Sequence, residues 1–480
     1  MDKHNSTTLD DIFHPRAIAV VGASGAPYNI NTQMFLDSLI HFGFPGQVYP
    51  INPNFQEISG LKVYPSIMEV PGPVDLVTSL VPARATPQLL RECVAKGVRA
   101  IQLFTAGFAE TGEEEGRQLQ EELVRIARTG GVRVIGPNCV GIYCPESRIS
   151  YASDFPKEPG KVAFITQSGG YSYLAIRMGA ARGVRFSKTV SFGNASDLNE
   201  CELLEYLAGD RDTSIIAAYI EGTRDGRRLL RALRDAASKK PVIITKKGRT
   251  EAGARGASSH TGALAGDDAI WDVALRQAGA IRVEDVEEVI DLLVTFLFLP
   301  LPKGRKAVVV GVGGGVGVRA SDECESGGLK LPRIPDDLRA QLNRYVPLAG
   351  AMLRNPVDVL AEPHGDVVWM PILKALDSWD EADMMLWHFS PDMEPLRGQV
   401  IQDLMVQLRG SMLKSFSSVS KPKAVSVHAV ETSEGLGEMN AIRDMCRENG
   451  VAFYPSLYRA ARAISRCMDY HRWRSERALS

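Results

Sequence analysis

The sequence predicts an α/β protein built from doubly wound parallel sheets. Short apolar runs alternate with longer amphipathic stretches, which is the pattern of buried strands joined by helices. Three segments of the chain each open with an apolar strand followed by a glycine-rich turn. With 480 residues, of which 45% are hydrophobic and 23% charged, the chain has an ordinary globular composition and room for about three domains. We therefore expect one topology to recur, although the sequence shows no repeat.

The first segment contains a series of apolar runs that we expect to be strands. They span residues 17–24, 48–53, 75–83, 100–107 and 132–138. Amphipathic stretches at 86–97 and 112–131 are predicted to be helices that cover a parallel sheet. The proline-containing stretch 145–160 indicates a boundary, so the first domain is expected to span residues 1–148.

Two further domains follow the same plan. Strands of the second are expected within 161–170, 187–194, 214–222 and 240–249, before a closing stretch at 267–299. LPLPKG, at 299–304, indicates a linker, and the third domain has strand-like runs within 306–328, 383–389 and 423–430. We expect these domains to span 155–299 and 303–465, followed by a tail at 466–480, in which the polar, basic stretch YHRWRSERALS (470–480) is expected to be a fraying helix.

Charge and cysteine content exclude several classes of function. The chain has 55 Lys and Arg against 57 Asp and Glu, so no overall positive field attracts nucleic acid. The seven cysteines include no CxxC pair, which is typical of reduced thiols in an intracellular protein. The N-terminus lacks the apolar core of a signal peptide, and the longest apolar stretch, 290–301, is too short to span a bilayer. We expect a cytoplasmic protein that binds neither nucleic acid nor membrane.

The first glycine-rich turn, VVGASGAP at 20–27, follows a predicted strand and precedes a helix. Glycine lets the backbone approach an anion, and a helix start offers free N–H groups. The spacing is not G-x-G-x-x-G, and the next strand ends in INPN (51–54), without the carboxylate that binds a ribose. The turn therefore favours a nucleotide-like ligand other than NAD; a turn that serves only sheet packing is the alternative.

Two later strand ends carry further candidates. TQSGG places Ser168, Gly169 and Gly170 at an expected helix start, which suits an anion, although a tight turn without a ligand fits equally well. AAYIEG places Glu221 just past an apolar strand, where doubly wound sheets bind their ligands. Glu221 could accept a hydrogen bond from an imidazole and stabilise a phosphorylated ring, or it could be a solvated charge.

The segment ASSHTGALAGDD, at 257–268, is expected to be a loop with one histidine, His260, among small residues. A neutral imidazole is a competent nucleophile near pH 7, and small neighbours leave room for a charged adduct. A purely structural histidine is the alternative. No HxxH or HExxH pair occurs, so no metal site is predicted.

Two other glycine-rich stretches are less specific. VGVGGGVGV, at 310–318, looks like a phosphate loop but lacks the Gly-Lys-Ser/Thr of a Walker site. KKGRTEAGARG, at 246–256, is basic and could contact phosphates or form a solvated loop.

The order of these motifs resembles a known family. It reads VVGAS, INPN, VPA, FTAGFAETG, GPNCVG, TQSGG, SFGNASDLNE, YIEG and KPVIITKKGRTEAGARGASSHTGALAG, then GGGVG and LRNPVDV. This order is similar to the α-type part of the NDP-forming acyl-CoA synthetases, such as ADP-forming acetyl-CoA synthetase, which are distant relatives of succinyl-CoA synthetase. The resemblance covers residues 8–465, and 241–283 is its most specific stretch.

The resemblance implies a Rossmann-like CoA-binding domain followed by two flavodoxin-like, succinyl-CoA synthetase-like domains. His260 matches the histidine that is phosphorylated, and Glu221 matches its paired glutamate. Ser168, Gly169 and Gly170 match the helix start that cradles the phosphohistidine and the acyl phosphate. The positions implied at the coenzyme A site are Gly22, Ala23, Ser24, Gly25, Pro53, Val81, Pro82 and Asn138, with the stretch 107–110 near its acyl end.

The family reaction joins a carboxylic acid to coenzyme A with ATP, through phosphohistidine and acyl phosphate, and releases ADP and phosphate. Nothing in the chain resembles an ATP-grasp domain. The resemblance therefore implies a separate β-type ATP-grasp subunit that binds Mg-ATP or Mg-GTP, in a hetero-oligomer such as α₂β₂. Tyr171 departs from the family pattern and adds a bulky ring beside the acyl-phosphate site, which favours a larger, aromatic acid over acetate.

Other readings remain open. A non-catalytic CoA or acyl-CoA sensor of the same fold is the main alternative, although the chain retains both His260 and Glu221. A protein acyltransferase would need a further domain and usually lacks the histidine. A dinucleotide-dependent dehydrogenase is disfavoured because the ribose-binding carboxylate is missing.

Overall fold

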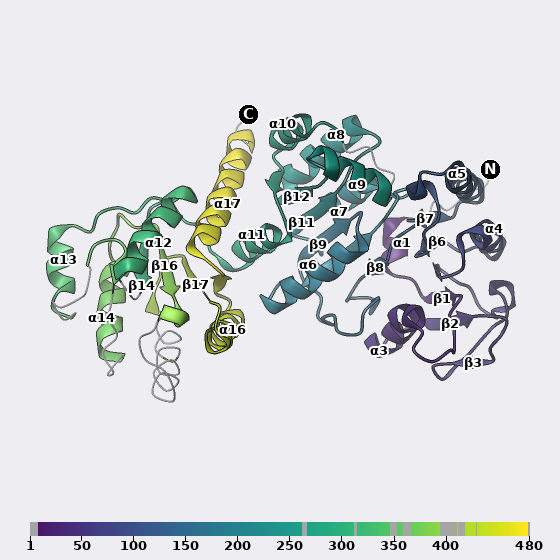
Figure 1. The fold of residues 1–480 in the computed structure, drawn as a ribbon, viewed down its shortest axis with the longest axis horizontal. Coiled ribbons are helices and arrows are strands. Elements are labelled where there is room, and N and C mark those ends of the chain that lie inside the picture. Colours follow the sequence, from purple (N-terminus) through teal and green to yellow (C-terminus); the bar gives the residue numbers. More distant parts are fainter. Residues whose placement is uncertain are drawn as a thin grey trace. The chain divides into compact units, whose positions relative to one another are not determined.

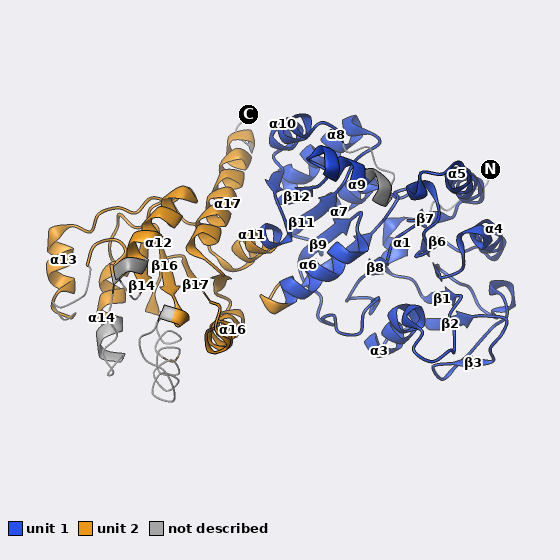
Figure 2. Cartoon of the chain, in the orientation of Figure 1, with its two compact units in different colours: residues 1–180, 185–289 blue, residues 181–184, 290–480 orange. Residues whose placement is uncertain are grey.

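The computed structural model describes residues 8–261, 266–311, 314–345, 353–358, 366–393, 410, 418–428 and 430–478. The described chain contains three parallel sheets with helices on their faces (Figure 1). It divides into two compact units (Figure 2). Unit 1 comprises Met1–Ala180 and Arg185–Val289 and holds the first two sheets, and unit 2 comprises Ala181–Val184 and Ile290–Ser480 and holds the third.

The first sheet has the strand order β2-β1-β5-β6-β7, with every pairing parallel. Its strands are β1 (Ala17–Val21), β2 (Gln47–Ile51), β5 (Leu76–Ser79), β6 (Ala100–Leu103) and β7 (Arg133–Ile135). The associated helices are α1 (Leu9–Phe13), α2 (Ile30–Thr32), α3 (Ser38–Phe42), α4 (Thr86–Lys96) and α5 (Glu114–Gly130), and β3 (Glu57–Ile58) pairs with β4 (Leu61–Lys62). β1 and β5 are buried along their whole length, which explains their unbroken apolar sequences.

The second sheet has the order β13-β12-β11-β9-β10-β8. Its strands are β8 (Gly141–Tyr143), β9 (Val162–Thr166), β10 (Phe186–Ser191), β11 (Ile215–Ile220), β12 (Val242–Lys246) and β13 (Ile281–Val283). Its helices are α6 (Gly169–Ala181), α7 (Glu200–Gly209), α8 (Gly226–Lys239), α9 (Glu251–Thr261) and α10 (Asp268–Ala278); α11 (Val286–Phe298) begins in unit 1 and continues into unit 2. β8 pairs antiparallel with β10 at the sheet edge, so residues of the expected first domain complete the second sheet.

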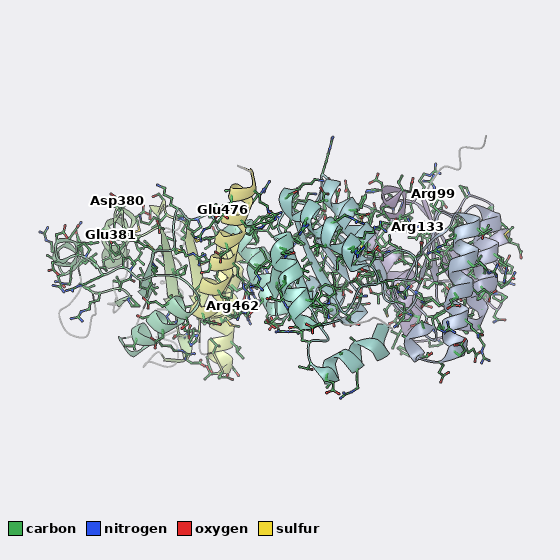
Figure 3. The ribbon with its side chains drawn as sticks, turned by 90° about the horizontal axis from the view of Figure 1, so that it is seen from above. Arg99, Arg133, Asp380, Glu381, Arg462 and Glu476 are labelled. Atoms are coloured by element: carbon green, nitrogen blue, oxygen red, sulfur yellow. The ribbon has the colours of Figure 1, made fainter. Side chains whose placement is uncertain are left out.

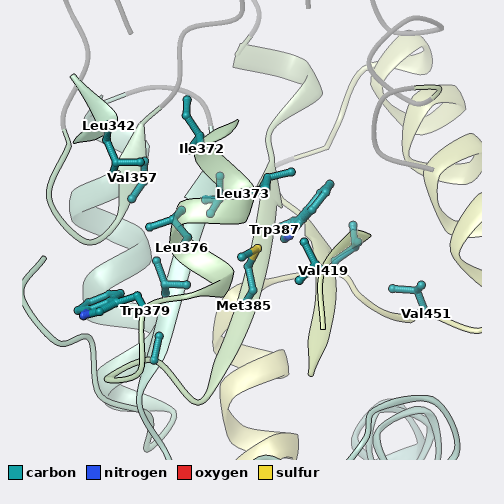
Figure 4. Packing of buried hydrophobic residues seen from close by; sticks show 14 of the residues in the cluster. Leu342, Val357, Ile372, Leu373, Leu376, Trp379, Met385, Trp387, Val419 and Val451 are labelled. Atoms are coloured by element: carbon teal, nitrogen blue, oxygen red, sulfur yellow. The ribbon is translucent and has the colours of Figure 1, made fainter. Parts of the chain in front are cut away.

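The third sheet has the order β15-β14-β16-β17-β18. Its strands are β14 (Ala307–Gly311), β15 (Val357–Asp358), β16 (Met384–Phe389), β17 (Lys423–Val427) and β18 (Ala452–Tyr454). Its helices include α12 (Gly314–Ser326), α13 (Asp336–Leu342), α14 (Asp366–Asp377), α16 (Ser433–Glu448) and α17 (Leu457–Ala478). One face of the sheet packs Met385 and Trp387 into an apolar core with side chains of α13, α14 and α16 (Figure 4).

The parallel strands of all three sheets share one order. In each, the first strand has the second on one side and the third on the other, so the chain reverses direction across the sheet between the first and third strands. This is the order of the flavodoxin-like fold, which binds ligands at that reversal, the topological switch point. The expectation of one recurring topology is confirmed.

The first two sheets are joined within unit 1 by charged contacts. Arg133, labelled in Figure 3, lies at the start of β7 and forms ion pairs with Asp197 at 2.9 Å and with Glu202 of α7 at 2.8 Å. All three side chains are largely buried, so these contacts stabilise the junction more than exposed ion pairs would.

Among the described residues, no helix combines the length and apolar character needed to cross a membrane.

Two local expectations need correction. The segment from 257 was expected to be a loop, but residues 251–261 form α9, because Ala, Glu and Arg favour helix and the Thr250 hydroxyl accepts the Gly253 N–H at the helix start. Residues 262–265 lie outside the described chain. The expected tail at 466–480 begins inside α17, where Cys467 and Tyr470 are buried, so its first turns are packed rather than frayed.

Candidate active site

The switch point of the first sheet lies between β1 and β5. The turn after β1 is held to both neighbouring strands, since Gly22 N donates to Ile51 O at 2.9 Å and Leu80 N donates to Val21 O at 2.8 Å. These contacts bring three segments together at the carboxyl ends of β1, β2 and β5: Gly22–Gly25, Pro53 and Val81–Pro82. These positions, all implied for the coenzyme A site, therefore converge, and Asn138 is connected to them through Thr105, whose hydroxyl donates to Val81 O at 2.5 Å.

The glycines of this turn are also required by packing. Gly22 has φ +90°, and a Cβ there would lie 3.2 Å from the Leu80 carbonyl carbon. A Cβ on Gly25 would lie 2.9 Å from the Phe55 ring. Asn52, at the end of β2, donates its side-chain amide to Ala23 O at 2.7 Å, where a dinucleotide site would carry a carboxylate.

Asn138 lies in the loop after β7, which reaches the second sheet. Its N–H donates to Thr105 O at 3.0 Å. Gly193 packs so closely on this loop that a Cβ there would lie 2.3 Å from Asn138 O. Further along the same loop, the Val140 side chain packs on the start of α6, so that a Cβ on Gly169 would lie 3.0 Å from it. The loop therefore joins the first domain to the start of α6.

The switch point of the second sheet lies between β9 and β11, and it carries both groups of candidates. Ser168 follows β9, and its hydroxyl accepts the Tyr171 N–H at 3.4 Å. α6 begins at Gly169, and the first N–H groups of a helix have no partners within it. Ser168 and Gly169 are half-buried and Gly170 is exposed, so this positive helix end is accessible to an anion.

Glu221 follows β11 at the same switch point, where it is 3% exposed. The Tyr219 hydroxyl donates to its carboxylate at 3.1 Å. Gln167, which precedes Ser168, accepts the N–H groups of Glu221 at 2.5 Å and Gly222 at 3.2 Å. Glu221 is thus a buried, held carboxylate, and the reading of it as a solvated strand-end charge is wrong.

His260 lies in the last turn of α9, and its side chain is outside the described part of the structure. α9 packs against the short helix η4 (Ala109–Thr111) of the first domain. The stretch 107–110, implied near the acyl end of coenzyme A, is therefore beside the helix that carries the histidine. The pairing of His260 with Glu221 stays a prediction.

A pocket of about 190 Å³ opens next to this switch point. Gln167 and Gly222 line it, together with Asn194 and polar side chains around the starts of α7 and α8. Arg224 lines it too and donates to Asn194 O at 3.3 Å, without an ion-pair partner in the described chain. The pocket provides a polar cavity adjoining Glu221.

Four residues of this region were missed by the sequence reasoning: Gln167, Asn194, Tyr219 and Lys246. Tyr219 had a readable signal, because residues two apart on a strand share a face. Lys246, at the end of β12, is buried with its ammonium 5.1 Å from the centre of the Trp271 ring, and burial lowers its pKa to about 8. The position of Lys246 in this region depends on the pairing of β12 with β11, which cannot be read from the sequence.

The third sheet places a different set of side chains at its switch point. Part of the predicted phosphate loop, residues 312–313, lies outside the described chain. Beyond it, His388 lies in β16 and His428 directly follows β17, with the two ring centres 5.7 Å apart, and both are buried. Among the described residues, no cluster of His, Cys, Asp or Glu could hold a metal ion.

Comparison with known families assigns a class to this arrangement. A CoA binding domain matches residues 16–145, a succinyl-CoA ligase like flavodoxin domain matches 159–296, and a ligase-CoA domain matches 307–376. The first two domains are thus those of a CoA ligase of the succinyl-CoA ligase type. The predicted fold class is confirmed.

Individual relatives narrow this class. The α subunit of acetate–CoA ligase (ADP-forming) I of Pyrococcus furiosus is 33% identical over 98% of this chain and 99% of its own. The α subunit of the II enzyme is 40% identical over 75% and 77%. The chain belongs to the family of α subunits of ADP-forming acetate–CoA ligases. A solved structure, dinucleotide-forming acetyl-coenzyme A synthetase 1 of Ca. Korarchaeum cryptofilum with phosphate and ADP, has a TM-score of 0.82 at 32% identity and covers 99% of both chains.

This membership supports the predicted activity of an ADP-forming acid–CoA ligase and disfavours the sensor alternative.

Proposed function

We propose that this chain is the phosphohistidine-carrying, CoA-binding subunit of a ligase that joins a small carboxylic acid to coenzyme A. A separate β-type ATP-grasp subunit supplies Mg-ATP or Mg-GTP, in a hetero-oligomer of the α₂β₂ kind. The observation that carries this proposal is the shared switch point: the open start of α6 at Ser168–Gly170 and the buried Glu221 adjoin one another at the ends of β9 and β11.

The chemistry divides into three transfers. The His260 imidazole takes the terminal phosphoryl group of the nucleotide, which leaves as the diphosphate. The acid's carboxylate oxygen then attacks that phosphorus, giving an acyl phosphate and regenerating the imidazole. Finally the coenzyme A thiol, losing its proton, attacks the acyl carbon and releases phosphate. Phosphorylation of the acid turns its carboxylate oxygen, a poor leaving group, into phosphate, a better one, and the histidine intermediate divides one difficult transfer into easier ones.

The roles of the other residues follow from charge. The free N–H groups at Gly169 and Gly170 and the positive helix end stabilise the phosphoryl oxygens. The Glu221 carboxylate accepts the second imidazole N–H, which sets the tautomer and stabilises the phosphorylated ring. Coenzyme A binds at Gly22–Gly25, Pro53 and Val81–Pro82. Its binding site extends toward α6 at Asn138.

Tyr171 bears on the choice of acid. Its half-buried ring lies in the first turn of α6 and stacks on Tyr219, with ring centres 4.0 Å apart. The ring provides an aromatic contact surface near the start of α6, and we propose that the acid is larger than acetate and can be aromatic.

A phosphorylation assay tests the proposal. The purified chain is mixed with labelled Mg-ATP, with and without its ATP-grasp partner, and acid-labile, base-stable phosphate is mapped by mass spectrometry. We expect label on His260 only when the partner is present. Absence of label under both conditions, in protein that binds coenzyme A, would overturn the ligase proposal.

A further inference from the structure

Glu221 is held from two directions. Its backbone N–H is fixed by the Gln167 side chain, which is itself 4% exposed. Its carboxylate accepts the Tyr219 hydroxyl at 3.1 Å. Tyr219 is 8% exposed, and burial, reinforced by the neighbouring carboxylate, raises the pKa of Tyr219, so the hydroxyl remains a donor over the working pH range.

The same tyrosine contacts the anion-binding helix start. Its ring packs on Tyr171 at an interplanar angle of 34°, and Tyr171 N donates to the Ser168 hydroxyl. The Tyr171 hydroxyl makes no hydrogen bond within the described part of the chain. Tyr219 therefore contacts the Glu221 carboxylate with its hydroxyl, and with its ring it contacts Tyr171 in the first turn of α6.

We infer that Tyr219 is a positioning residue: it orients the Glu221 carboxylate and sets its distance from the start of α6. An imidazole between them must donate to the carboxylate while its phosphoryl group meets the helix start. A carboxylate free to rotate would satisfy this geometry only part of the time. Because Glu221 matters to catalysis only if His260 is phosphorylated, this role rests on the function proposed above.

The key variant is Tyr219→Phe, which keeps the ring stack and removes the hydroxyl. Tyr173→Phe is the matched control, because it removes a tyrosine hydroxyl from α6, which donates to Tyr151 O at 3.0 Å, without touching Glu221. Both are measured for the rate of His260 phosphorylation by the partner and labelled Mg-ATP, from pH 5.5 to 9. Circular dichroism, thermal unfolding and coenzyme A binding confirm that each variant is folded.

We expect Tyr219→Phe to slow phosphorylation by about tenfold, the loss typical of a hydrogen bond to a charged group. Tyr173→Phe should match the wild-type rate. In a Glu221→Gln background, Tyr219→Phe should have little further effect, because its target is gone.

The outcomes separate the two proposals. Wild-type protein that takes no label overturns the proposed function, and the role of Tyr219 falls with it. Label in the wild type, with equal phosphorylation rates for Tyr219→Phe and Tyr173→Phe, overturns the positioning role alone. A slow Tyr219→Phe variant whose loss is undiminished in the Glu221→Gln background would also overturn it, because Tyr219 would then act independently of Glu221.

Discussion

The side-chain amide of Asn194 donates to the carboxylate of Glu110 at 2.5 Å, across the junction of the first two sheets in unit 1. Both residues are buried, and Glu110 also accepts the N–H groups of Gly107 and Phe108. Since α9 packs against the short helix that contains Glu110, this contact supports the surface on which the histidine-bearing helix lies.

Asn194→Asp should therefore destabilise unit 1. The substitution replaces a donor with a second carboxylate, and two buried like charges would face one another. We expect a loss of about 3 kcal/mol in the free energy of unfolding at pH 7, measured by urea denaturation, and a smaller loss near pH 4, where one carboxyl can be protonated. Asn199→Asp is the control, because Asn199 caps α7 and Asp caps a helix equally well. Equal stability of the two variants would contradict the prediction.

His260→Ala should abolish phosphorylation and ligase turnover while leaving coenzyme A binding unchanged. The reason is that the nucleophile lies on α9, whereas the implied coenzyme A positions gather at the first sheet. Turnover is followed by the acid-dependent release of phosphate, and binding by calorimetry. His41→Ala, at an exposed position, should behave as the wild type. Substantial turnover by His260→Ala would rule out the phosphohistidine route.

Unit 2 should lose stability in mild acid. Burial lowers the pKa of His388 from 6.5 to about 4, and the neighbouring His428 adds to this effect, whereas Glu323 opposes it. Below pH 6.5 the unfolded chain therefore binds a proton that the folded chain excludes. Stability is complete above pH 6.5 and falls as the pH drops toward 4, by about 3 kcal/mol from this one group.

Tryptophan fluorescence reports this transition, because four of the five tryptophans belong to unit 2. His388→Gln should flatten the pH dependence of urea unfolding between pH 6.5 and 4. The same substitution at the exposed His41 should leave it unchanged. A wild-type unfolding curve that does not move across this range would show that His388 is not buried in its neutral form.

Lys246→Met should stabilise unit 1 at pH 7. The pKa of Lys246 falls from 10.5 to about 8 because the ammonium is taken out of water, so below pH 8 the folded protein bears the cost of a buried charge. Wild-type stability rises with pH between 8 and 10.5, as the folded state loses the proton that the unfolded state keeps. The advantage of the methionine, measured as an increase in Tm, should therefore shrink over that range.

Lys239→Met, at an exposed position of α8, is the control and should change Tm little at any pH. If Lys246→Met lowers Tm at pH 7, the contact between the ammonium and the Trp271 ring outweighs the cost of burying the charge.

Buried strands with unbroken apolar sequences were predictable, whereas β8, β15 and α9 were not. β9, β11 and β12 are buried throughout, so their sequences are continuous apolar runs. β8 and β15 comprise three and two residues, too few to show a period, and they are strands only because a neighbour pairs with them. α9 was mistaken for a loop because its glycines and serines obscured the helix-forming residues around them.

The sequence by itself determined the fold class, the recurring strand and glycine-rich turn, and the family to which the motifs belong. These properties depend on local patterns of burial and on residue order, which are legible along the chain. Tertiary structure alone decided that Glu221 is buried beside the start of α6, that Tyr219 and Gln167 hold it, and that Asn194 meets Glu110. Those contacts join residues up to 84 positions apart, and the order in which parallel strands pair, not their order in the chain, brings them together.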